Sequence, residues 1–384
     1  MTEFDNLNVQ ALPALLRPLL AVCPLWAGKK LHPCIIANPQ SGGFTIKKRS
    51  EHHKTILAEA AKNAAVKPIC TDIVAFPLYV TEYSGHATFI TRVILDEALR
   101  SRFADEYLII TAGGDGTSLE VQTVLLKAAL ADKKAYKLIT ERITVLRLPF
   151  GTGNDGTDGR TIEEAVSRLT KSAHFQKQKA VKVYYEGIEP KDESSRKKIA
   201  EYGSLDKTAP WYAFNIASVG IDAFITHYTN RFHSIFPGDF YKFFVDVACL
   251  FYSWFFPSGK MHVEVFENDG TKINDITGNA LFCSLGVSGN RTYGSGQKIL
   301  PDERNFCFTR NMSNLQKLFI KKKFLKGRHT KSKYATFANA SIIRIEYSKP
   351  ILAQMDGEVH MLDGCHFPLI MELTEPIIRT IVLD

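Results

Sequence analysis

Three short glycine-rich segments contain the residues best suited to chemistry. They span residues 38–43, 113–117 and 149–155, and each follows an apolar stretch expected to be a strand. Glycine lets backbone N–H groups approach an anion closely, and the N-terminus of a following helix adds its positive dipole end. A single turn of this kind more often only connects a strand to a helix and binds no ligand. Three of them at the edge where parallel sheets bind ligands predict a polyphosphate site.

Two common nucleotide-binding motifs do not describe these turns. Residues 151–156 match GxGxxG, but they follow the fourth predicted strand instead of opening the first βαβ unit. Asp155 would also set a carboxylate beside the pyrophosphate. No Gly-Lys-Ser/Thr follows any of the turns, so the Walker A pattern is absent.

The elements that must position these turns change in character halfway along the chain. Between His32 and Ser172, short apolar stretches alternate with stretches of helical period, which predicts βαβ units and a parallel sheet. After Lys179, segments such as 341–347 alternate with the two-residue period of a half-buried strand. Helical signal in this half is largely confined to residues 238–256. We therefore expect an α/β nucleotide-binding domain followed by a mainly β, sandwich-like domain.

The expected domain organisation has four parts. Residues 1–30 show no clear period and are predicted to be an N-terminal extension. Residues 31–178 form the α/β domain, and residues 179–356 form the β-rich domain, with residues 186–209 as an exposed insertion. For residues 357–384 we expect C-terminal strands, with a return to the first domain left open.

Composition and charge exclude several classes of protein. The 384 residues include 48 Lys and Arg against 40 Asp and Glu, and eight of the basic residues lie between Lys317 and Lys333. This mild surplus does not indicate a nucleic-acid-binding protein. Seven scattered cysteines suggest neither a disulfide framework nor a zinc site, which favours a cytoplasmic location. We predict no transmembrane segment, because the most apolar run, residues 243–256, is shorter than the ~20 residues that a span needs.

Two clusters outside the glycine-rich turns each have two interpretations. The basic segment 317–333 is either a solvated loop or a contact with anionic lipid, at ~1 kcal/mol per basic residue. The aromatic stretch 240–256 is either core or the lining of an acyl-chain tunnel.

Six spaced motifs, considered together, resemble the diacylglycerol kinase catalytic-domain family, which includes sphingosine kinases and bacterial lipid kinases. The resemblance covers roughly residues 32–384. The motifs are Asn38-Pro39-x-Ser41-Gly42, Thr81-Glu82 with His86-Ala87, Gly113-Gly114-Asp115-Gly116-Thr117 with Glu120, Pro149-x-Gly151-Thr152-x-Asn154-Asp155, Ser218-Val219-Gly220-Ile221-Asp222-Ala223, and Met355-Asp356-Gly357-Glu358.

This resemblance implies a function and its cofactors. The fold would combine an ATP-binding domain like that of NAD kinases and lipid kinases with a β-sandwich that recognises lipid, and the active site would lie between them. The activity would be an ATP- and Mg²⁺-dependent lipid kinase of phospholipid metabolism, phosphorylating a hydroxyl of diacylglycerol, a sphingoid base or a related lipid. The enzyme would be cytoplasmic and peripherally associated with a membrane. Whether it forms a homodimer is left open.

The resemblance also assigns roles to residues. Asp115 is the first choice for the general base, although an N-cap or turn aspartate would look the same in sequence. Asp356 is the rival base, and Asp356 with Glu358, two apart on an expected strand, would coordinate Mg²⁺. Glu120 would support the site and Asp222 would support it or contact substrate. The implied nucleotide contacts are Asn38, Pro39, Ser41, Gly42, Thr81, Gly113, Gly114, Gly116, Thr117, Gly151, Thr152, Asn154 and Asp155.

Two other functions compete with a lipid kinase. A kinase like NAD kinase shares the GGDGT turn, but the chain lacks an Asn-Glu adenosine-recognition motif. A non-catalytic sensor of nucleotide or lipid would keep the glycines and lose the acids, whereas Asp115, Asp356 and Glu358 are all present.

Overall fold

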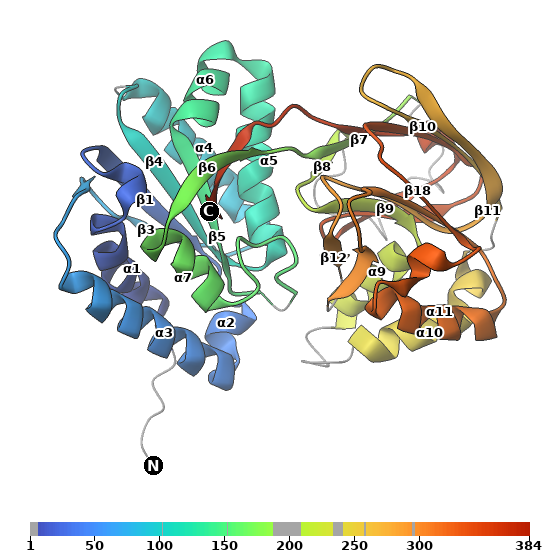
Figure 1. The fold of residues 1–384 in the computed structure, drawn as a ribbon, viewed down its shortest axis with the longest axis horizontal. Coiled ribbons are helices and arrows are strands. Elements are labelled where there is room, and N and C mark those ends of the chain that lie inside the picture. The colour runs from blue at the N-terminus through green and yellow to red at the C-terminus, as the bar shows by residue number, and fades with distance from the viewer. Residues whose placement is uncertain are drawn as a thin grey trace. The chain divides into compact units, whose positions relative to one another are not determined.

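The chain folds into two compact units (Figure 1). The computed structural model describes residues 7–101, 103–151, 153–186, 209–232, 241–256, 259–293 and 296–384. The first unit comprises Met1–Gln178 and Pro376–Asp384, and the second unit comprises Lys179–Glu375. Most of the insertion expected at residues 186–209 lies outside the described residues.

A largely parallel sheet forms the centre of the first unit. Its strands lie in the order β2-β1-β4-β5-β20-β6, with β3 also paired to β1. Only the β20–β6 pair is antiparallel among the described pairs of this sheet. The strands are β1 (Lys30–Ala37), β2 (Asp72–Ile73), β3 (Leu78–Val80), β4 (Glu106–Gly113), β5 (Ile143–Pro149), β6 (Ala173–Gln178) and β20 (Ile378–Leu383).

Helices cover both faces of this sheet (Figure 1). On one face pack α1 (Leu12–Ala21), α3 (Lys47–Ala65) and α7 (Ile162–Thr170), and on the other pack α4 (His86–Arg100), α5 (Asp115–Ala131) and α6 (Lys133–Glu141). The central strands β4 and β5 are buried along their whole length, as the near-continuous apolar runs of a parallel sheet require. The short helix α2 (Gly42–Thr45) follows β1 directly.

The structure shows three features of the first unit that the sequence did not predict. Residues 12–21 form a helix, whose buried Leu12, Leu16, Leu19 and Leu20 follow the helical period despite two prolines. The helix α6 was not expected. The return of the C-terminal strands to the first unit, which the sequence left open, involves Pro376–Asp384, and β20 inserts between β5 and β6.

The second unit is a β-sandwich with antiparallel pairing throughout its described strands. The strand order is β18-β17-β9-β11-β10-β16-β19-β7-β8, and β14 pairs with β11 and β15. These strands are β7 (Val181–Tyr185), β8 (Trp211–Ala213), β9 (Ile216–Gly220), β10 (Lys260–Phe266), β11 (Lys272–Gly286), β14 (Phe306–Arg310), β15 (Ala335–Ala338), β16 (Ile342–Glu346), β17 (Ile351–Met355), β18 (Glu358–Leu362) and β19 (Leu369–Leu373). A separate hairpin joins β12 (Arg291–Tyr293) to β13 (Gln297–Leu300).

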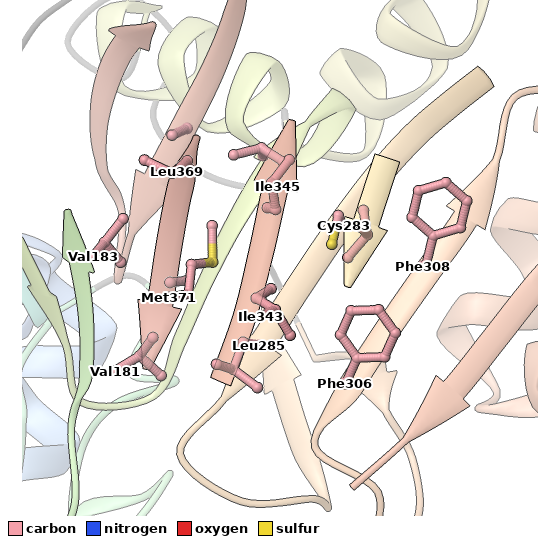
Figure 2. Close-up of a cluster of buried hydrophobic side chains, with 14 of the residues drawn as sticks. Val181, Val183, Cys283, Leu285, Phe306, Phe308, Ile343, Ile345, Leu369 and Met371 are labelled. Carbon is pink, nitrogen blue, oxygen red and sulfur yellow. The ribbon is translucent and has the colours of Figure 1, made fainter. Parts of the chain in front are cut away.

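The long strand β11 connects the two layers of the sandwich. Its first half pairs with β10, and its second half pairs with β9 and β14. Alternate residues of the strands point into one apolar core, as Figure 2 shows for Val181 and Val183, Ile343 and Ile345, and the phenylalanines of β14. The expected fold class, an α/β domain followed by a mainly β domain, is confirmed.

Among the described residues, three α-helices belong to the second unit. They are α9 (Ile221–Phe232), α10 (Tyr241–Phe255) and α11 (Asn314–Leu325). Of these, α9 packs on β9 and β17, and α10 packs on α9 and α11. The expectation that helical structure is confined to residues 238–256 is therefore wrong. A capping box between Ser313 and Gln316 starts α11, and this short-range signal is visible in the sequence. Among the described residues, no helix combines the length and apolar character needed to cross a bilayer.

Candidate functional site

The turns at residues 38–43 and 149–151 are joined directly in the first unit. The backbone N–H of Gly43 donates to the carbonyl of Phe150 at 2.7 Å. A Cβ on Gly43 would lie 2.6 Å from the Phe150 ring, so only glycine permits this approach. The guanidinium of Arg49 donates to the carbonyl of Gly151 at 2.7 Å. The first turn therefore fixes the third.

The third turn also contacts the second. A Cβ on Gly151 would lie 2.6 Å from the Cα of Gly114. Asn154 takes a positive φ of 55°, which asparagine tolerates better than most residues, and its side-chain amide donates to the carbonyl of Pro149 at 3.1 Å. All three glycine-rich segments thus meet at the carboxyl ends of β1, β4 and β5, where open α/β sheets bind their ligands.

Asp115, the first residue of α5, lies where the second and third turns meet. Its half-buried carboxylate accepts the backbone N–H of Gly156 at 3.2 Å. Burial raises the pKa of Asp115 above its usual value, although backbone N–H groups of residues 154–156 and the charge of Arg147 act in the opposite direction. A carboxylate with a raised pKa, held by backbone donors, is suited to accept a proton.

The other predicted residues of the first unit lie around this point. Asn38 shapes the first turn, because its carbonyl accepts the N–H of Ser41 at 3.1 Å. The N–H of Thr81 donates to the carbonyl of Ala37 at 2.9 Å, which fixes the segment after β3 beside β1. Pro39 and Gly42 belong to the first turn, Gly113 ends β4, Gly116 and Thr117 lie in the first turn of α5, and Asp155 follows β5. Thr152 lies outside the described residues.

Glu120 has a positioning role. Its carboxylate accepts the backbone N–H groups of Gly85 at 2.9 Å and Thr88 at 3.2 Å, at the N-terminus of α4. A carboxylate is stabilising at a helix N-terminus because it satisfies unpaired donors and complements the dipole. Burial nevertheless raises the pKa of Glu120. The residue therefore ties the N-terminus of α4 to α5.

These turns fit a nucleotide polyphosphate. Gly114 precedes α5 with no side chain capping the helix, so first-turn N–H groups can meet an anion. The Oδ1 atom of Asn154 is buried and has no hydrogen-bond partner in the described part of the chain, so it is available to a ligand or to ligand-bound water. Which residues contact the nucleotide stays a prediction.

The two acids expected to share a strand face do not share it. Asp356 and Gly357 are the central residues of the β17–β18 hairpin, with φ angles of 48° and 99°, and Glu358 begins β18. Asp-Gly is a preferred pair for such a two-residue turn because both positions need positive φ. The chain reverses between the two acids, so Asp356 is buried and Glu358 is exposed.

The carboxylate of Asp356 is occupied by backbone donors. It accepts the N–H groups of Phe214, of Asn215 at 3.1 Å and of Ile216 at 2.9 Å. This arrangement fixes the segment that leads into β9. It gives Asp356 a positioning role, and Glu358 is the member of the pair whose carboxylate is exposed.

A buried chain of hydrogen bonds connects the hairpin to Asp222. The N–H of Gly357 donates to Gln354 at 3.1 Å, the amide of Gln354 donates to the Ser218 hydroxyl at 2.7 Å, and that hydroxyl donates to Asp222. Burial raises the pKa of Asp222, with the Ser218 hydrogen bond acting against this shift.

Asp222 lines an apolar cavity of about 60 Å³ inside the second unit. Its Oδ1 atom is buried and has no hydrogen-bond partner in the described residues. Lys317 also lines the cavity, and burial lowers the pKa of its ammonium group. The apolar lining comes from α9, α10, α11, β11 and β13, with Ile221, Ile225, Val245, Leu281, Phe282, Ile299, Ile320 and Phe324.

Three residues that support the turns were not identified from the sequence. Arg147 and Asp158 form a buried ion pair at 2.8 Å, and Asp158 also accepts the N–H of Arg147 at 2.6 Å. This pair closes the segment after β5 back onto its own strand. A charged residue inside the apolar run of β5 was the available signal, since arginine is rarely buried without a partner. Arg49 left no comparable signal, because its partner lies 102 residues away.

One further acidic cluster does not offer a convincing metal site. His262, Glu264 and Asp275 bring their ligand atoms within 4.8 Å of one another, and they are the only such group of three in the described part of the chain. Lys272 already bonds Glu264 at 2.7 Å and Asp275 at 3.1 Å. The ammonium group therefore neutralises the position that a cation would take.

Comparison with known proteins agrees with this arrangement. Residues 32–184 match the family model described as "Diacylglycerol kinase catalytic domain". No curated protein matches the chain. A solved structure from Bacillus anthracis str. Sterne, provisionally described as a diacylglycerol kinase, has a TM-score of 0.53 and 17% identity over 93% of this chain and 98% of its own.

A second structure supports the same fold. It is described as a diacylglycerol kinase from Bacillus anthracis str. Sterne, with a TM-score of 0.51 and 18% identity over 92% of this chain and 96% of its own. At such identities the likeness shows the fold. The family match to residues 32–184, which contain all three glycine-rich turns, identifies a domain of the diacylglycerol kinase catalytic-domain family in this chain.

Proposed function

We propose that this protein is an ATP-dependent lipid kinase that phosphorylates the hydroxyl group of diacylglycerol, a sphingoid base or a related lipid. The observation that carries the proposal is the meeting of three glycine-rich turns around the carboxylate of Asp115. Phosphoryl transfer depends on positioning the phosphates and orienting the acceptor hydroxyl, and this arrangement offers groups for both tasks.

The nucleotide would be held by backbone donors of the turns. The N–H groups of Gly114, Gly116 and Thr117 lie at the start of α5, where a polyphosphate gains from both hydrogen bonds and the helix dipole. Asn154 would add its unpartnered side-chain oxygen. Mg²⁺ bound with ATP would neutralise the charge that develops on the transferred phosphoryl group. Glu358 is our proposed protein ligand for it, since both oxygens of Asp356 accept backbone hydrogen bonds.

Asp115 would orient the acceptor hydroxyl and take its proton. Backbone N–H groups from residues 154–156 hold the carboxylate in one orientation, so little rearrangement is needed when the hydroxyl arrives. The raised pKa of Asp115 brings it closer to neutral pH, where a base works best. Glu120 and Arg49 would maintain the position of the turns without touching the substrate.

The lipid would be recognised in the second unit. The cavity beside Asp222 combines apolar walls with one unpartnered carboxylate oxygen, which suits a hydroxyl group attached to a hydrocarbon. At about 60 Å³ the cavity holds about two water-sized groups, so it would take one small polar group of the lipid, other than the acceptor hydroxyl, and leave the hydrocarbon chain outside.

A transfer assay tests the proposal. Purified protein is incubated with radiolabelled ATP, Mg²⁺ and separate preparations of diacylglycerol, sphingoid base, mixed extracted lipids and NAD. We expect label in a lipid. Label in NAD would replace the proposal with a kinase like NAD kinase, and label in neither would favour a sensor.

Variants of two acids separate substrate recognition from general effects. Asp222→Asn should raise the KM for the lipid and leave the KM for ATP unchanged, because Asp222 lies in the second unit's cavity. Asp275→Asn is the matched control, since this acid belongs to the same unit but is exposed. Equal lipid KM values in all three proteins would refute the role of Asp222.

A further inference from the structure

Helix α10 exposes apolar side chains on the face that points away from the core. Leu250, Phe251, Trp254 and Phe255 recur at helical spacing, and 76% of Trp254 and 59% of Phe255 are exposed. The opposite face of the helix is also apolar and packs into the second unit with Ala248 and other residues. A helix that is apolar all round normally has both faces covered. The outer face of α10 therefore lacks a cover among the described residues.

Helix α11 continues this exposed surface and changes it from apolar to basic. Leu315 and Phe319 are 69% and 71% exposed, and one and two turns further on the same face are the exposed Lys322, Lys323 and Lys326. Successive offsets of four, three, one and three residues keep all five on one side of the helix.

Two hydrogen bonds and an ion pair connect the two helices. The amide of Asn314 donates to the carbonyl of Leu250 at 3.1 Å, and the ammonium of Lys317 donates to the Ser253 hydroxyl at 2.8 Å. Lys321 forms an ion pair with Asp246 at 2.6 Å. We call the surface made by residues 250, 251, 254, 255, 315, 319, 322, 323 and 326 the α10–α11 face.

The segment that forms α11 and the residues after it carries charge of one sign. Residues 304–345 contain no Asp or Glu, and they supply Arg328, Lys331 and Lys333 just after the lysines of α11. Asp246, the acid of α10, is already paired with Lys321. A second copy of the chain would bring lysines against lysines, which is repulsive. An anionic surface would be complementary to the face.

We propose that the α10–α11 face docks the protein on an anionic lipid bilayer. Trp254, Phe255, Leu315 and Phe319 would enter the interface between headgroups and acyl chains, where tryptophan and other amphipathic rings are stable. Lys322, Lys323 and Lys326 would extend to the phosphates with their stems along the apolar surface. This inference extends the proposed function, because α10 and α11 also line the cavity at Asp222.

Vesicle sedimentation without ATP tests the docking independently of catalysis. At ~1 kcal/mol per lysine, Lys322→Gln/Lys323→Gln/Lys326→Gln should reduce binding to phosphatidylserine-containing vesicles by on the order of 100-fold at low salt. Trp254→Ser/Phe319→Ser should also reduce binding, and high salt should not restore it. The matched control is Lys48→Gln/Lys62→Gln/Lys67→Gln, which removes the same charge from exposed positions of the first unit.

The outcomes separate this inference from the proposed function. Loss of vesicle binding in both face variants, with the control unchanged, supports docking even if no lipid is phosphorylated. Failure of the wild type to bind anionic vesicles overturns it, even if a detergent-dispersed lipid is phosphorylated. Equal losses in the control variant, or a wild-type dimer that Trp254→Ser/Phe319→Ser separates in sedimentation velocity, would also overturn it.

Discussion

Replacing Asp115 with Asn should remove activity without destabilising the protein. A general base contributes about 10²–10⁴-fold to a rate, so Asp115→Asn should lower kcat by at least 100-fold, or ~3 kcal/mol in the barrier. The fold should tolerate the change, because the asparagine oxygen can still accept the Gly156 N–H that lies 3.2 Å from the carboxylate.

The pKa of Asp115 gives the sign of the stability effect. Burial raises this pKa in the folded protein, so the folded state binds the proton more tightly than the unfolded state. The contribution of Asp115 to stability is therefore lost as pH rises through the folded pKa. A neutral amide avoids that penalty. With one hydrogen bond altered, at about 1 kcal/mol, we expect Tm within ~4 °C of the wild type at pH 7.

Asp158→Asn is the control that should behave in the opposite way. It leaves Arg147 buried without its ion-pair partner, which is expected to cost about 3–5 kcal/mol. Thermal unfolding followed by circular dichroism, together with the transfer assay, measures both variants. A folded Asp115→Asn protein with wild-type turnover, or one whose Tm falls as far as that of Asp158→Asn, would refute the assignment of Asp115 as a base.

Three further changes have expected outcomes. Gly151→Ala should weaken ATP binding in a fluorescent-nucleotide titration, because the new Cβ would lie 2.6 Å from the Cα of Gly114 and push the turns apart. Burial raises the pKa of Glu106, but ion pairs led by that with Arg379 outweigh it and hold the pKa below its usual range. The stability that Glu106 contributes is thus present above its unfolded-state pKa and is lost as pH falls through its folded-state pKa. Glu106→Gln should therefore have a lower free energy of unfolding than the wild type at pH 7, and it should lose less of that free energy on acidification. Urea unfolding at several pH values measures both. Burial lowers the pKa of Lys317 in the folded protein, so the wild type gains stability as pH rises toward the pKa that Lys317 has in the unfolded state. Lys317→Met should remove that gain without lowering Tm at pH 7.

Local signals were sufficient to predict the scaffold of the first unit. The period of residues 47–65 predicted α3, because a helix with one buried face must repeat apolar residues every three or four positions. The three glycine-rich turns were also identifiable from local sequence. Their chemistry depends on backbone conformation and on the strand before them, and both are encoded within a few residues.

Contacts between distant segments could not be predicted in this way. Arg49 reaches the carbonyl of Gly151 across 102 residues, and nothing in the composition of α3 indicates that partner. The order of β20 between β5 and β6 likewise depends on a return of the chain from the second unit. Such features follow from the packing of the whole unit, where one charged side chain satisfies whichever buried acceptor the fold brings near it.

The acids show most clearly why a motif does not determine a residue's role. Asp115 and Asp356 both follow a buried strand, and both accept backbone N–H groups. Their spacing in the sequence therefore does not distinguish their roles. Asp356 lies in a tight turn with both oxygens occupied, and its hairpin connects through Gln354 and Ser218 to Asp222. A disturbance of Asp356 would therefore reach the cavity through the hydrogen bonds that orient Asp222. Loss of activity on mutating Asp356 would not by itself identify a catalytic residue, whereas a change in lipid KM with ATP KM preserved would indicate this indirect route.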